Sequence, residues 1–427
     1  MREALTNWAG NYQFHSERIH RPGTVEQVQD IVSRCATVKA LGSRHSFNTI
    51  ADTDADHVSL ERFNQVEEVD HERRTVTIGA GVRYGDLCGM LHRAGFALHN
   101  LASLPHISVA GACATATHGS GDQNGCLATA VRALEMVTAN GEIVSLSRDR
   151  DGEQFRGAVV GLGALGVVTR LTLDVVPTFV VRQDVYENLP LAAVEQHFDA
   201  LFSRAYSVSL FTDWRGDAVN QVWVKSRVTG SEPRTPESSL FGATIAASSR
   251  HPLPELSAEN CTEQMGICGP WHERLPHFRM EFTPSAGEEL QSEYLVPRQD
   301  AVRALHAING IRDRVAPCLL ISEIRTIAAD DLWMSPFYKQ PCVGIHFTWR
   351  KDWPAVREVM PAIEEALEPF NARSHWGKLF TMAPSRVQSL YEKLPDFQQL
   401  IRQYDPDGKF RNAFLDAYIN PVDAMGR

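Results

Sequence analysis

Two segments in the first third of the chain contain residue types suited to holding a ligand. A polar loop, GSRHSFN at residues 42–48, directly follows the strand-like segment 37–41, and a strand that runs into a polar loop is a common ligand-site arrangement. Residues 105–121, PHISVAGACATATHGSG, have few large side chains, so their backbone can approach a ligand closely and their N–H groups can form an anion-binding nest. Together the segments predict a clamp for a phosphate or pyrophosphate, while tight packing of two layers explains the small residues about as well.

A third glycine-rich segment, GLGALG at residues 161–166, matches the GxGxxG pattern of dinucleotide-binding sites. That pattern binds a pyrophosphate only when a helix follows, because the helix N-terminus supplies the oriented N–H groups. The residues that follow, VVTRLTL at 167–173, are β-branched and alternate as in a strand. The context therefore argues against a nicotinamide site and predicts a glycine-rich turn that enters a core strand.

Ionisable residues occur at strand spacing in two segments of the last third of the chain. Side chains two positions apart share one face of a strand. In the sequence SEIRTI, Glu323 and Arg325 therefore share a face opposite Ile324, and in GIHFTW, His346 and Thr348 share a face opposite apolar side chains. These faces predict a polar binding surface, and the alternative is a sheet that turns the same faces to solvent.

The composition argues against several classes of protein. The 427 residues allow roughly two to three domains, and 43% hydrophobic residues provide for a full core. A net charge of −10 argues against a nucleic-acid partner, since such proteins carry a basic surface. The eight cysteines include no CxxC pair, so neither a zinc site nor a disulfide scaffold is expected, and a reducing compartment fits best. Residues 1–14 lack the apolar core of a secretion signal, and the longest apolar stretch, 158–168, is too short to span a bilayer, so we expect a cytoplasmic protein.

Mixed helices and strands would position these segments, which predicts an α+β fold. Thr24 and Gln27 form a capping box before apolar residues at helical spacing, and Asn140-Gly141 is the favoured pair for a type I′ hairpin turn. Longer polar connections after about residue 178 indicate a second domain. The predicted elements are a helix at 24–35, a strand at 74–79, a helix at 84–92 ended by Gly95, a hairpin at 130–146 and a helix at 352–367 capped by Asp352.

Eight motifs, in order along the chain, carry a resemblance to a known superfamily. They are GSRHSFN at 42–48, NLASLPHISVAG at 100–111, ATHGSG at 116–121, QSEY at 291–294, EIRT at 323–326, HFTW at 346–349, HWGK at 375–378 and DPDGKFRNAF at 405–414. Through them the sequence resembles the FAD-linked oxidases of the vanillyl-alcohol oxidase superfamily, and within it the alditol (xylitol, sorbitol) oxidases most closely. The resemblance spans nearly the whole chain, and the last motif is shared with the related aldonolactone oxidases. It implies a PCMH-type FAD-binding domain at 1–178, completed by about 379–427, and a mixed α/β substrate-binding cap domain at 179–378.

The resemblance also implies which residues hold the cofactor, FAD. His45 matches the histidine that is bonded covalently to the flavin 8α-methyl group, a role that suits imidazole because it is a good neutral nucleophile near pH 7. Arg44 stands where close relatives often carry Gly and is a candidate phosphate contact. The other residues implied at the FAD site are Leu41, Gly42, Ser43, Ser46, Ser103, Ser108, Gly111, Thr115, Ala116, Thr117, His118, Val168 and His375.

The same resemblance also implies a binding site for a polyol substrate, formed mainly by residues of the later motifs. A polyol exposes a hydroxyl at every carbon, so its site must both donate and accept: Glu323 can accept from two hydroxyls, whereas Arg325 and Lys378 only donate. We expect these two cations to stabilise the alkoxide charge that develops as hydride leaves C1 for the flavin. The residues implied to bind substrate are Ser103, Glu323, Arg325, Thr348 and Lys378, and those implied in catalysis are Lys378, Arg325 and His346.

An alditol oxidation also needs one group to accept the hydroxyl proton and another to accept the electrons. Arg325 stays protonated, so the C1 hydroxyl proton passes either to His346 or to Lys378, the latter only if burial and Arg325 lower the pKa of the lysine. O₂ would reoxidise the flavin and yield hydrogen peroxide and an aldose. Ala102 lies where this superfamily can control the access of O₂.

Two other interpretations fit parts of the sequence. An aldonolactone oxidase or dehydrogenase shares HWGK and the terminal motif, although GSRHSFN and LASLPHIS favour alditols. A flavin-free carbohydrate-binding protein would keep the fold, but the intact His45, Arg325 and Lys378 argue against it. We expect a monomer whose partners are a small polyol and O₂, with no nucleic acid, membrane or metal ion.

Overall fold

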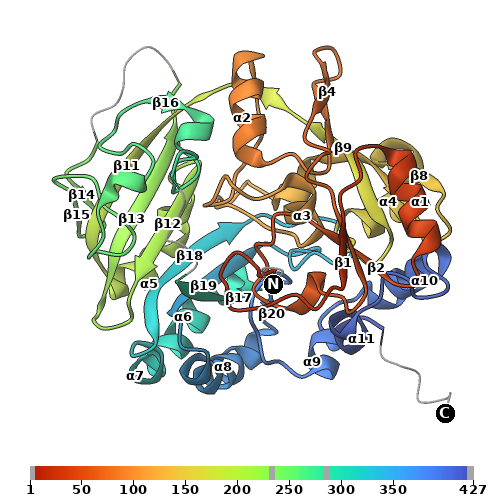
Figure 1. The fold of residues 1–427 in the computed structure, drawn as a ribbon. Helices are drawn as coiled ribbons and strands as arrows, with labels where there is room; N and C mark the ends of the chain where they lie inside the picture. The colour runs from red at the N-terminus through yellow and green to blue at the C-terminus, as the bar shows by residue number, and fades with distance from the viewer. Residues whose placement is uncertain (1–4, 230–235, 283–287, 421–427) are drawn as a thin grey trace.

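Two groups of strands and helices make up the structure, a computed structural model that describes residues 5–229, 236–282 and 288–420 (Figure 1). The first group contains the strands up to about residue 177 together with the C-terminal helices, and the second group contains the elements between them. Each group has a large hydrophobic core of its own. This mixture of helices and mainly antiparallel sheets confirms the α+β class, while the exact domain boundaries at 178 and 379 stay predictions.

A small parallel sheet opens the first group, with its strands in the order β1-β3-β2. The helix beside it begins at the predicted capping box: Thr24 accepts from the N–H of Gln27, and the Gln27 side chain accepts from the N–H of Gly23. Val28 and Val32 are fully buried, so the amphipathic helix is confirmed. The elements are β1 (Arg18–His20), α1 (Val25–Arg34), β2 (Val38–Leu41), η1 (Thr49–Ala51) and β3 (Asp56–Ser59).

A five-stranded antiparallel sheet, in the order β4-β5-β9-β7-β8, and an antiparallel pair of β6 and β10 are the other sheets of the first group. The predicted strand at 74–79 and the helix at 84–92 are confirmed as β5 and α2, and Gly95 follows α2 with a φ of 83°. The elements are β4 (Val66–Asp70), β5 (Thr75–Gly79), α2 (Tyr84–Arg93), β6 (Phe96–Ala97), α3 (Val109–Ala114), η2 (Leu127–Ala130), β7 (Val131–Val137), β8 (Ile143–Ser147), α4 (Arg148–Val159), β9 (Val167–Asp174) and β10 (Val176–Pro177).

The hairpin between β7 and β8 is confirmed, but the predicted type I′ turn is wrong. A type I′ turn needs positive φ at both central residues, whereas of Asn140 and Gly141 only the glycine has it, at 83°. The Asn140 side chain explains the difference. Its oxygen accepts from the Thr138 hydroxyl at 2.7 Å and from the Glu142 N–H at 3.1 Å, which closes a wider loop.

The glycine-rich turn at 161–166 leads into β9, as predicted. A methyl group on Gly166 would come within 2.6 Å of the Val137 carbonyl oxygen, so the glycine allows the turn to approach β7. Leu162 and Gly163 both have positive φ, at 52° and 67°. Because a strand follows, no helix N-terminus is available here for a dinucleotide pyrophosphate.

A ten-stranded antiparallel sheet forms the second group, in the order β14-β15-β11-β13-β12-β18-β19-β17-β20, with β16 also paired to β11. Ile324, Ile345 and Phe347 are buried in one core with α5, α6 and α8, so these helices cover one face of the sheet. Asp352 caps α8 by accepting from the Ala355 N–H, as predicted. The strands are β11 (Val180–Pro190), β12 (Ser207–Thr212), β13 (Ala218–Arg227), β14 (Ser239–Leu240), β15 (Ala243–Ile245), β16 (Gly269–Pro270), β17 (Glu289–Pro297), β18 (Leu319–Ile327), β19 (Cys342–Arg350) and β20 (Arg373–Ser374).

The C-terminal helices return to the first group and share its core. Between α10 and α11 the buried Asp405 carboxylate accepts from the N–H groups of Lys409 and Phe410, at 2.6 and 2.8 Å, and so fixes the terminal motif as a tight turn. The helices of the second half are α5 (Leu191–Phe202), α6 (Ala301–Gly310), α7 (Arg312–Val315), α8 (Trp353–Leu367), α9 (Pro384–Ser389), α10 (Leu394–Tyr404) and α11 (Ala413–Tyr418).

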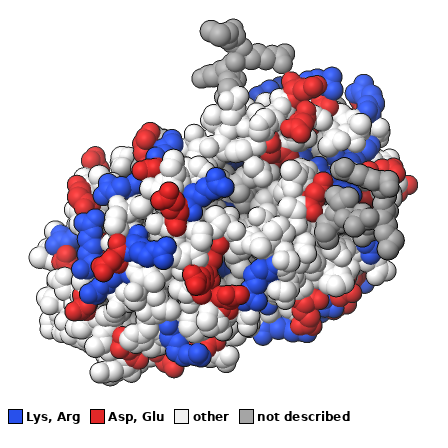
Figure 2. Space-filling view, turned by 90° about the horizontal axis from the view of Figure 1, so that it is seen from below, with Lys and Arg blue, Asp and Glu red and all other residues white. Residues whose placement is uncertain are grey.

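The surface carries both signs of charge. On the face shown in Figure 2, lysines and arginines are interspersed with aspartates and glutamates rather than gathered by sign. Within the described residues, no helix combines the length and the apolar character that crossing a membrane requires. All eight cysteines are free thiols.

Candidate active site

One cavity of about 870 Å³ extends between the two groups of elements. Its volume falls within the range of pockets that bind cofactors and small molecules. Every residue that the sequence assigned to the cofactor or the substrate lines this cavity, except Ala116. Ala116 is fully buried with a φ of 53°, so it turns the chain between its two threonine neighbours instead of facing the cavity.

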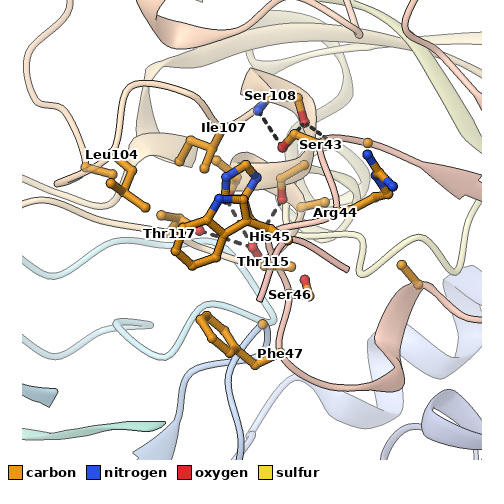
Figure 3. A pocket seen from close by; sticks show the side chains of 18 of the residues that line it. Ser43, Arg44, His45, Ser46, Phe47, Leu104, Ile107, Ser108, Thr115 and Thr117 are labelled. Atoms are coloured by element: carbon orange, nitrogen blue, oxygen red, sulfur yellow. Dashed lines mark hydrogen bonds between the residues drawn. The ribbon is translucent and has the colours of Figure 1, made fainter. Parts of the chain in front are cut away.

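His45 lies on the cavity wall in the loop between β2 and η1 (Figure 3). Both ring nitrogens are shielded from solvent, and neither makes a hydrogen bond to a residue that the structure describes. Burial lowers the pKa of His45 to about 4, and His106 and Arg83 act in the same direction. A neutral imidazole with two unpartnered buried nitrogens is unusual in a folded protein and fits attachment of a group that occupies the cavity.

The N-terminal segment 5–14 holds this loop in place, a role that the sequence analysis missed. The ring of Trp8 stacks on the His45 imidazole with centroids 5.4 Å apart and planes at 19°. Asn7 donates to the Ser46 carbonyl and Asn11 to the Phe47 carbonyl, both at 2.9 Å. No pattern of period or charge marks the segment, since its contacts are single side chains bonded to distant backbone groups.

Ser43 and Ser108 join the two small-residue segments (Figure 3). The Ser108 N–H donates to the Ser43 hydroxyl oxygen at 2.9 Å, and the two hydroxyl oxygens are 3.4 Å apart. A methyl group on Gly42 or Gly111 would come within 2.8 Å of the Ser108 hydroxyl oxygen, so both glycines allow this approach. The predicted convergence of the two segments on one cavity is therefore observed.

Both explanations of the small residues at 105–121 hold, each for a part of the segment. Ser108, Gly111, Thr115 and Thr117 line the cavity. Gly119 instead packs against backbone, where a methyl group would come within 2.3 Å of the Leu101 carbonyl oxygen. The turn at 161–166, which the sequence assigned to packing alone, also lines the cavity.

Arg44 does not direct its guanidinium toward the His45 ring (Figure 3). Its Nη1 donates to the Thr6 carbonyl at 3.1 Å, so its hydrogen bond is to the N-terminal segment. Its φ of 63° is in the left-handed region, which glycine adopts without strain. The backbone conformation at this position is therefore one that glycine would adopt with less strain.

Three neighbouring strands bring the polar residues of the second group together. In the register of the sheet, Glu323 of β18 pairs with His346 of β19, and His346 pairs with Glu293 of β17. Arg325 and Thr348 lie on the same face, two residues further along their strands. Glu323, Arg325, His346 and Thr348 are between 5% and 8% exposed, so the alternative of a solvent-facing sheet is wrong.

Glu293 is the central charged residue of this face, and the sequence analysis did not select it. Its carboxylate lies 2.9 Å from Arg325 Nη2, 3.1 Å from Lys378 Nζ and 3.1 Å from His118 Nε2. Burial alone would raise the pKa of Glu293, but Lys378, His118 and Arg325 outweigh it and hold that pKa well below the ordinary value. Arg325 and Lys378 therefore share the Glu293 carboxylate. Their positive charges disfavour binding of a metal ion by Glu293 and His375.

The alternation in QSEY could have identified Glu293. Gln291 and Glu293 share a strand face in the same way as Glu323 and Arg325. Gln291 also lines the cavity, and its Oε1 lies 3.2 Å from His346 Nε2.

Lys378 and His346 are the two candidate proton acceptors, and their surroundings differ. Burial lowers the pKa of Lys378, Glu293 raises it and Arg325 lowers it further. Burial also holds the pKa of His346 well below its ordinary value, so this imidazole is neutral. Because the Gln291 amide nitrogen donates to Glu289, its oxygen faces His346, so Nε2 of His346 carries the hydrogen and Nδ1 keeps the lone pair.

Glu323 is held by His277, a residue of the cavity wall that the sequence analysis did not select. His277 Nε2 lies 2.7 Å from Glu323 Oε1, and Arg325 Nε lies 3.6 Å from the same oxygen. Burial would raise the pKa of Glu323, but Arg325 and His277 lower it below its ordinary value. The other oxygen, Oε2, has no hydrogen-bond partner among the described residues.

Ser103 and His375 complete the cavity wall beside these charges. Arg325 Nη1 lies 3.4 Å from the Ser103 hydroxyl oxygen. Nδ1 of His375 accepts from the Gly377 N–H at 3.0 Å, and burial lowers the pKa of His375 to about 3. The wall as a whole offers fixed acceptors, fixed cations and a neutral imidazole, which suits recognition of several hydroxyl groups and removal of one proton.

Comparisons with known proteins agree with this geometry. A family model of an FAD binding domain matches residues 16–147, and a model of D-arabinono-1,4-lactone oxidase matches residues 286–418. The chain is 50% identical over 419 residues to an alditol oxidase from a Streptomyces species, covering 97% of this chain and 99% of that protein. It is 27% identical over 436 residues to L-gulonolactone oxidase from Bos taurus, covering 96% of this chain and 97% of that protein. Its fold resembles the crystal structure of cholesterol oxidase from Brevibacterium sterolicum, with a TM-score of 0.75, 14% identity and coverage of 97% of this chain and 96% of that chain.

Proposed function

Because the chain belongs to the alditol oxidase family of FAD-dependent oxidoreductases, we propose that it oxidises the terminal primary alcohol of alditols such as xylitol and sorbitol to the aldose. One observation carries this proposal: Glu323, His346 and the Glu293-bound cations form a continuous buried face on the cavity that His45 also lines. Such a face can accept from and donate to successive hydroxyl groups.

The cofactor fits the first group of elements. When bound, FAD supplies the two-electron chemistry, taking hydride from the alcohol carbon and passing the electrons to O₂ to give hydrogen peroxide. We propose that His45 holds it covalently, which would engage one of the ring nitrogens that have no partner. Ser43, Ser108 and Gly111 would hold the phosphate-bearing part, because they line the same cavity and have small side chains.

The protein's own residues divide the remaining work. Glu323 Oε2 accepts from substrate hydroxyls, and Arg325 and Lys378 donate to the oxygen at C1 and stabilise the negative charge that develops there. We assign proton acceptance to His346 Nδ1, because the contact with Gln291 leaves the lone pair of the imidazole on that nitrogen. Glu293 keeps both cations in place and favours the charged form of Lys378.

The domain division is proposed on the same basis. His45, Ser43 and Ser108 come from residues 1–178, whereas Glu323 and His346 come from residues 179–378. The tail from about 379 shares the core of the first group and completes it. The cytoplasmic location and the monomeric state stay predictions, and the latter is checked by the mass of the holoenzyme in solution.

Comparing substrates tests the reaction. We expect peroxide release with xylitol and sorbitol to exceed that with gulono-1,4-lactone. A clear preference for the lactone would instead assign the chain to aldonolactone oxidation. Rapid bleaching of the flavin by alditols with slow recovery in air would make the enzyme a dehydrogenase.

Acid precipitation tests the covalent bond. We expect the yellow colour to stay with the precipitated protein, and the peptide that contains His45 to carry the mass of the flavin. The His45→Ala variant is expected to release its flavin into the supernatant. A colourless wild-type precipitate would contradict the attachment.

A further inference from the structure

A buried lysine and a buried histidine are linked to Glu323, and neither has a part in the proposed reaction, although His277 also lines the cavity. Lys225 of β13 is 1% exposed and His277 is 5% exposed. Lys225 Nζ lies 3.0 Å from His277 Nδ1, and His277 Nε2 lies 2.7 Å from Glu323 Oε1. The three side chains therefore form one continuous chain of hydrogen bonds that ends at the substrate cavity.

The direction of each hydrogen in this chain follows from the donor groups. An ammonium group only donates, so His277 Nδ1 accepts from Lys225, and Nε2 must then carry the hydrogen that it donates to Glu323. Burial lowers the pKa of His277 to about 4, so the ring is neutral, as this assignment requires. The chain thus supplies Glu323 with a fixed hydrogen-bond donor on one oxygen only.

Packing fixes the position of each member. Lys225 also donates to the carbonyl groups of Leu275 and Pro276, at 2.6 and 3.1 Å, so all three of its N–H groups have acceptors. The His277 ring meets the rings of Phe211 and Trp223 edge-on, with centroids 5.5 and 5.1 Å away. Neither the lysine nor the imidazole can turn without breaking several of these contacts.

Glu323 has a competing partner on its own strand. Arg325 Nε is 3.6 Å from Oε1, beyond a normal hydrogen bond but within reach if the carboxylate turns. The hydrogen bond from His277 opposes that turn and leaves Oε2 free to face the cavity. A carboxylate that turned toward Arg325 would use its acceptor oxygens on the guanidinium instead of on a substrate hydroxyl.

We propose that Lys225 and His277 are positioning residues for polyol recognition, which hold Glu323 so that one carboxylate oxygen stays available to a substrate hydroxyl. This inference rests on the proposed function, because the ligand it concerns is the alditol. It assigns to Lys225 and His277 an effect on the affinity for substrate rather than on the chemical step.

Steady-state kinetics of flavin-loaded variants with xylitol test the proposal at about pH 6. At this pH Lys225 is protonated, since burial lowers its pKa to about 7, and His277 is neutral. We expect Lys225→Met and His277→Leu to raise KM about tenfold and to leave kcat within about twofold, as for loss of a charge-assisted hydrogen bond. His277→Gln keeps a side-chain N–H donor and is expected to restore most of the affinity.

A double-variant cycle separates positioning from general destabilisation. In a Glu323→Gln background, Lys225→Met is expected to raise KM less than about twofold further, because it acts through Glu323. Arg182→Met is the matched control: it breaks a buried ion pair to Asp184 on β11, the strand beside β13, and should lower stability without raising KM. The wild-type arm tests the proposed function separately, since failure to oxidise any alditol would refute that function whatever the variants show.

Two results would overturn the inference. One is a KM for xylitol within about twofold of wild type in both Lys225→Met and His277→Leu. The other is a full, additive increase in KM when Lys225→Met is combined with Glu323→Gln. If the wild type oxidises only the lactone, an unchanged KM for the lactone in both single variants overturns it equally.

Discussion

Replacing Glu293 with glutamine removes the charge on which the arrangement of the two active-site cations depends. The Glu293 carboxylate is 1% exposed and lies 2.9 Å from Arg325 and 3.1 Å from Lys378. Glutamine has nearly the same shape and keeps one acceptor oxygen, so the change is largely one of charge. Because Glu293 raises the pKa of Lys378, we expect the pKa of Lys378 to fall in this variant.

The size of the effect follows from the distance. Two unit charges 3.1 Å apart attract by roughly 5 kcal/mol at an effective dielectric constant of about 20, which corresponds to roughly 4 pKa units. The glutamine dipole and local relaxation offset part of this, so we expect the pKa of Lys378 to fall by at least about one unit. Loss of the buried ion pairs should also lower the free energy of unfolding by roughly 3 kcal/mol.

The assay is the rate of anaerobic flavin reduction by xylitol as a function of pH. If the reaction requires the Lys378 ammonium, the alkaline limb of this profile moves to lower pH in Glu293→Gln. Asp184→Asn is the matched control, because it removes another buried carboxylate paired with an arginine, at 2.6 Å, away from the cavity. An alkaline limb that does not move would show that the reaction does not require the Lys378 ammonium. A shift of the acid limb to lower pH instead would favour Lys378 as the proton acceptor.

Three further predictions concern the loop, the tail and pH. Arg44→Gly should keep the covalent flavin. It should also raise the free energy of unfolding in denaturant titrations by up to about 1 kcal/mol, because glycine adopts the φ of 63° at this position without strain. Loss of bound flavin would show that the guanidinium is needed. Asp405→Ala should lower that free energy by roughly 2 kcal/mol, since it leaves two buried backbone N–H groups without an acceptor, and an unchanged melting temperature would contradict this. His277 and His375 are neutral in the fold, with pKa values lowered to about 4 and about 3, whereas these histidines bind protons below pH 6.5 in the unfolded chain. The free energy of unfolding should therefore fall as the pH drops from 6.5 to 4, by roughly 3 kcal/mol for each histidine. Denaturant midpoints that do not change over this pH range would contradict the prediction.

Strand phase was the most informative feature of the sequence. The alternation in SEIRTI and GIHFTW correctly placed Glu323 and Arg325 on one face and His346 and Thr348 on the adjacent strand. The strand that follows the glycine-rich turn at 161–166 argued correctly against a helix-capped nicotinamide site there, although the turn lines the cavity. These inferences succeeded because successive side chains of a strand point to opposite faces of the sheet, whether or not the strand is buried.

The residues that were missed depend on contacts between distant parts of the chain. The alternation in QSEY places Glu293 on the same face as Gln291, but its closeness to Arg325 and Lys378 could not be known before the sheet order β18-β19-β17 was seen. His277 and Trp8 lie outside any regular helix or strand, and only packing brings them to Glu323 and His45. The turn after β7 was wrong for a local reason, because a side-chain hydrogen bond from Thr138 outweighed the preference of the Asn-Gly pair.

Anaerobic mixing with xylitol shows whether a flavin in this cavity, beside the Lys378 and Arg325 cations, oxidises an alditol. We expect xylitol to bleach the flavin of the wild type, and to bleach that of Lys378→Ala at least about a hundredfold more slowly. A wild-type flavin that no alditol bleaches, or a Lys378→Ala variant that bleaches at the wild-type rate, would contradict this expectation.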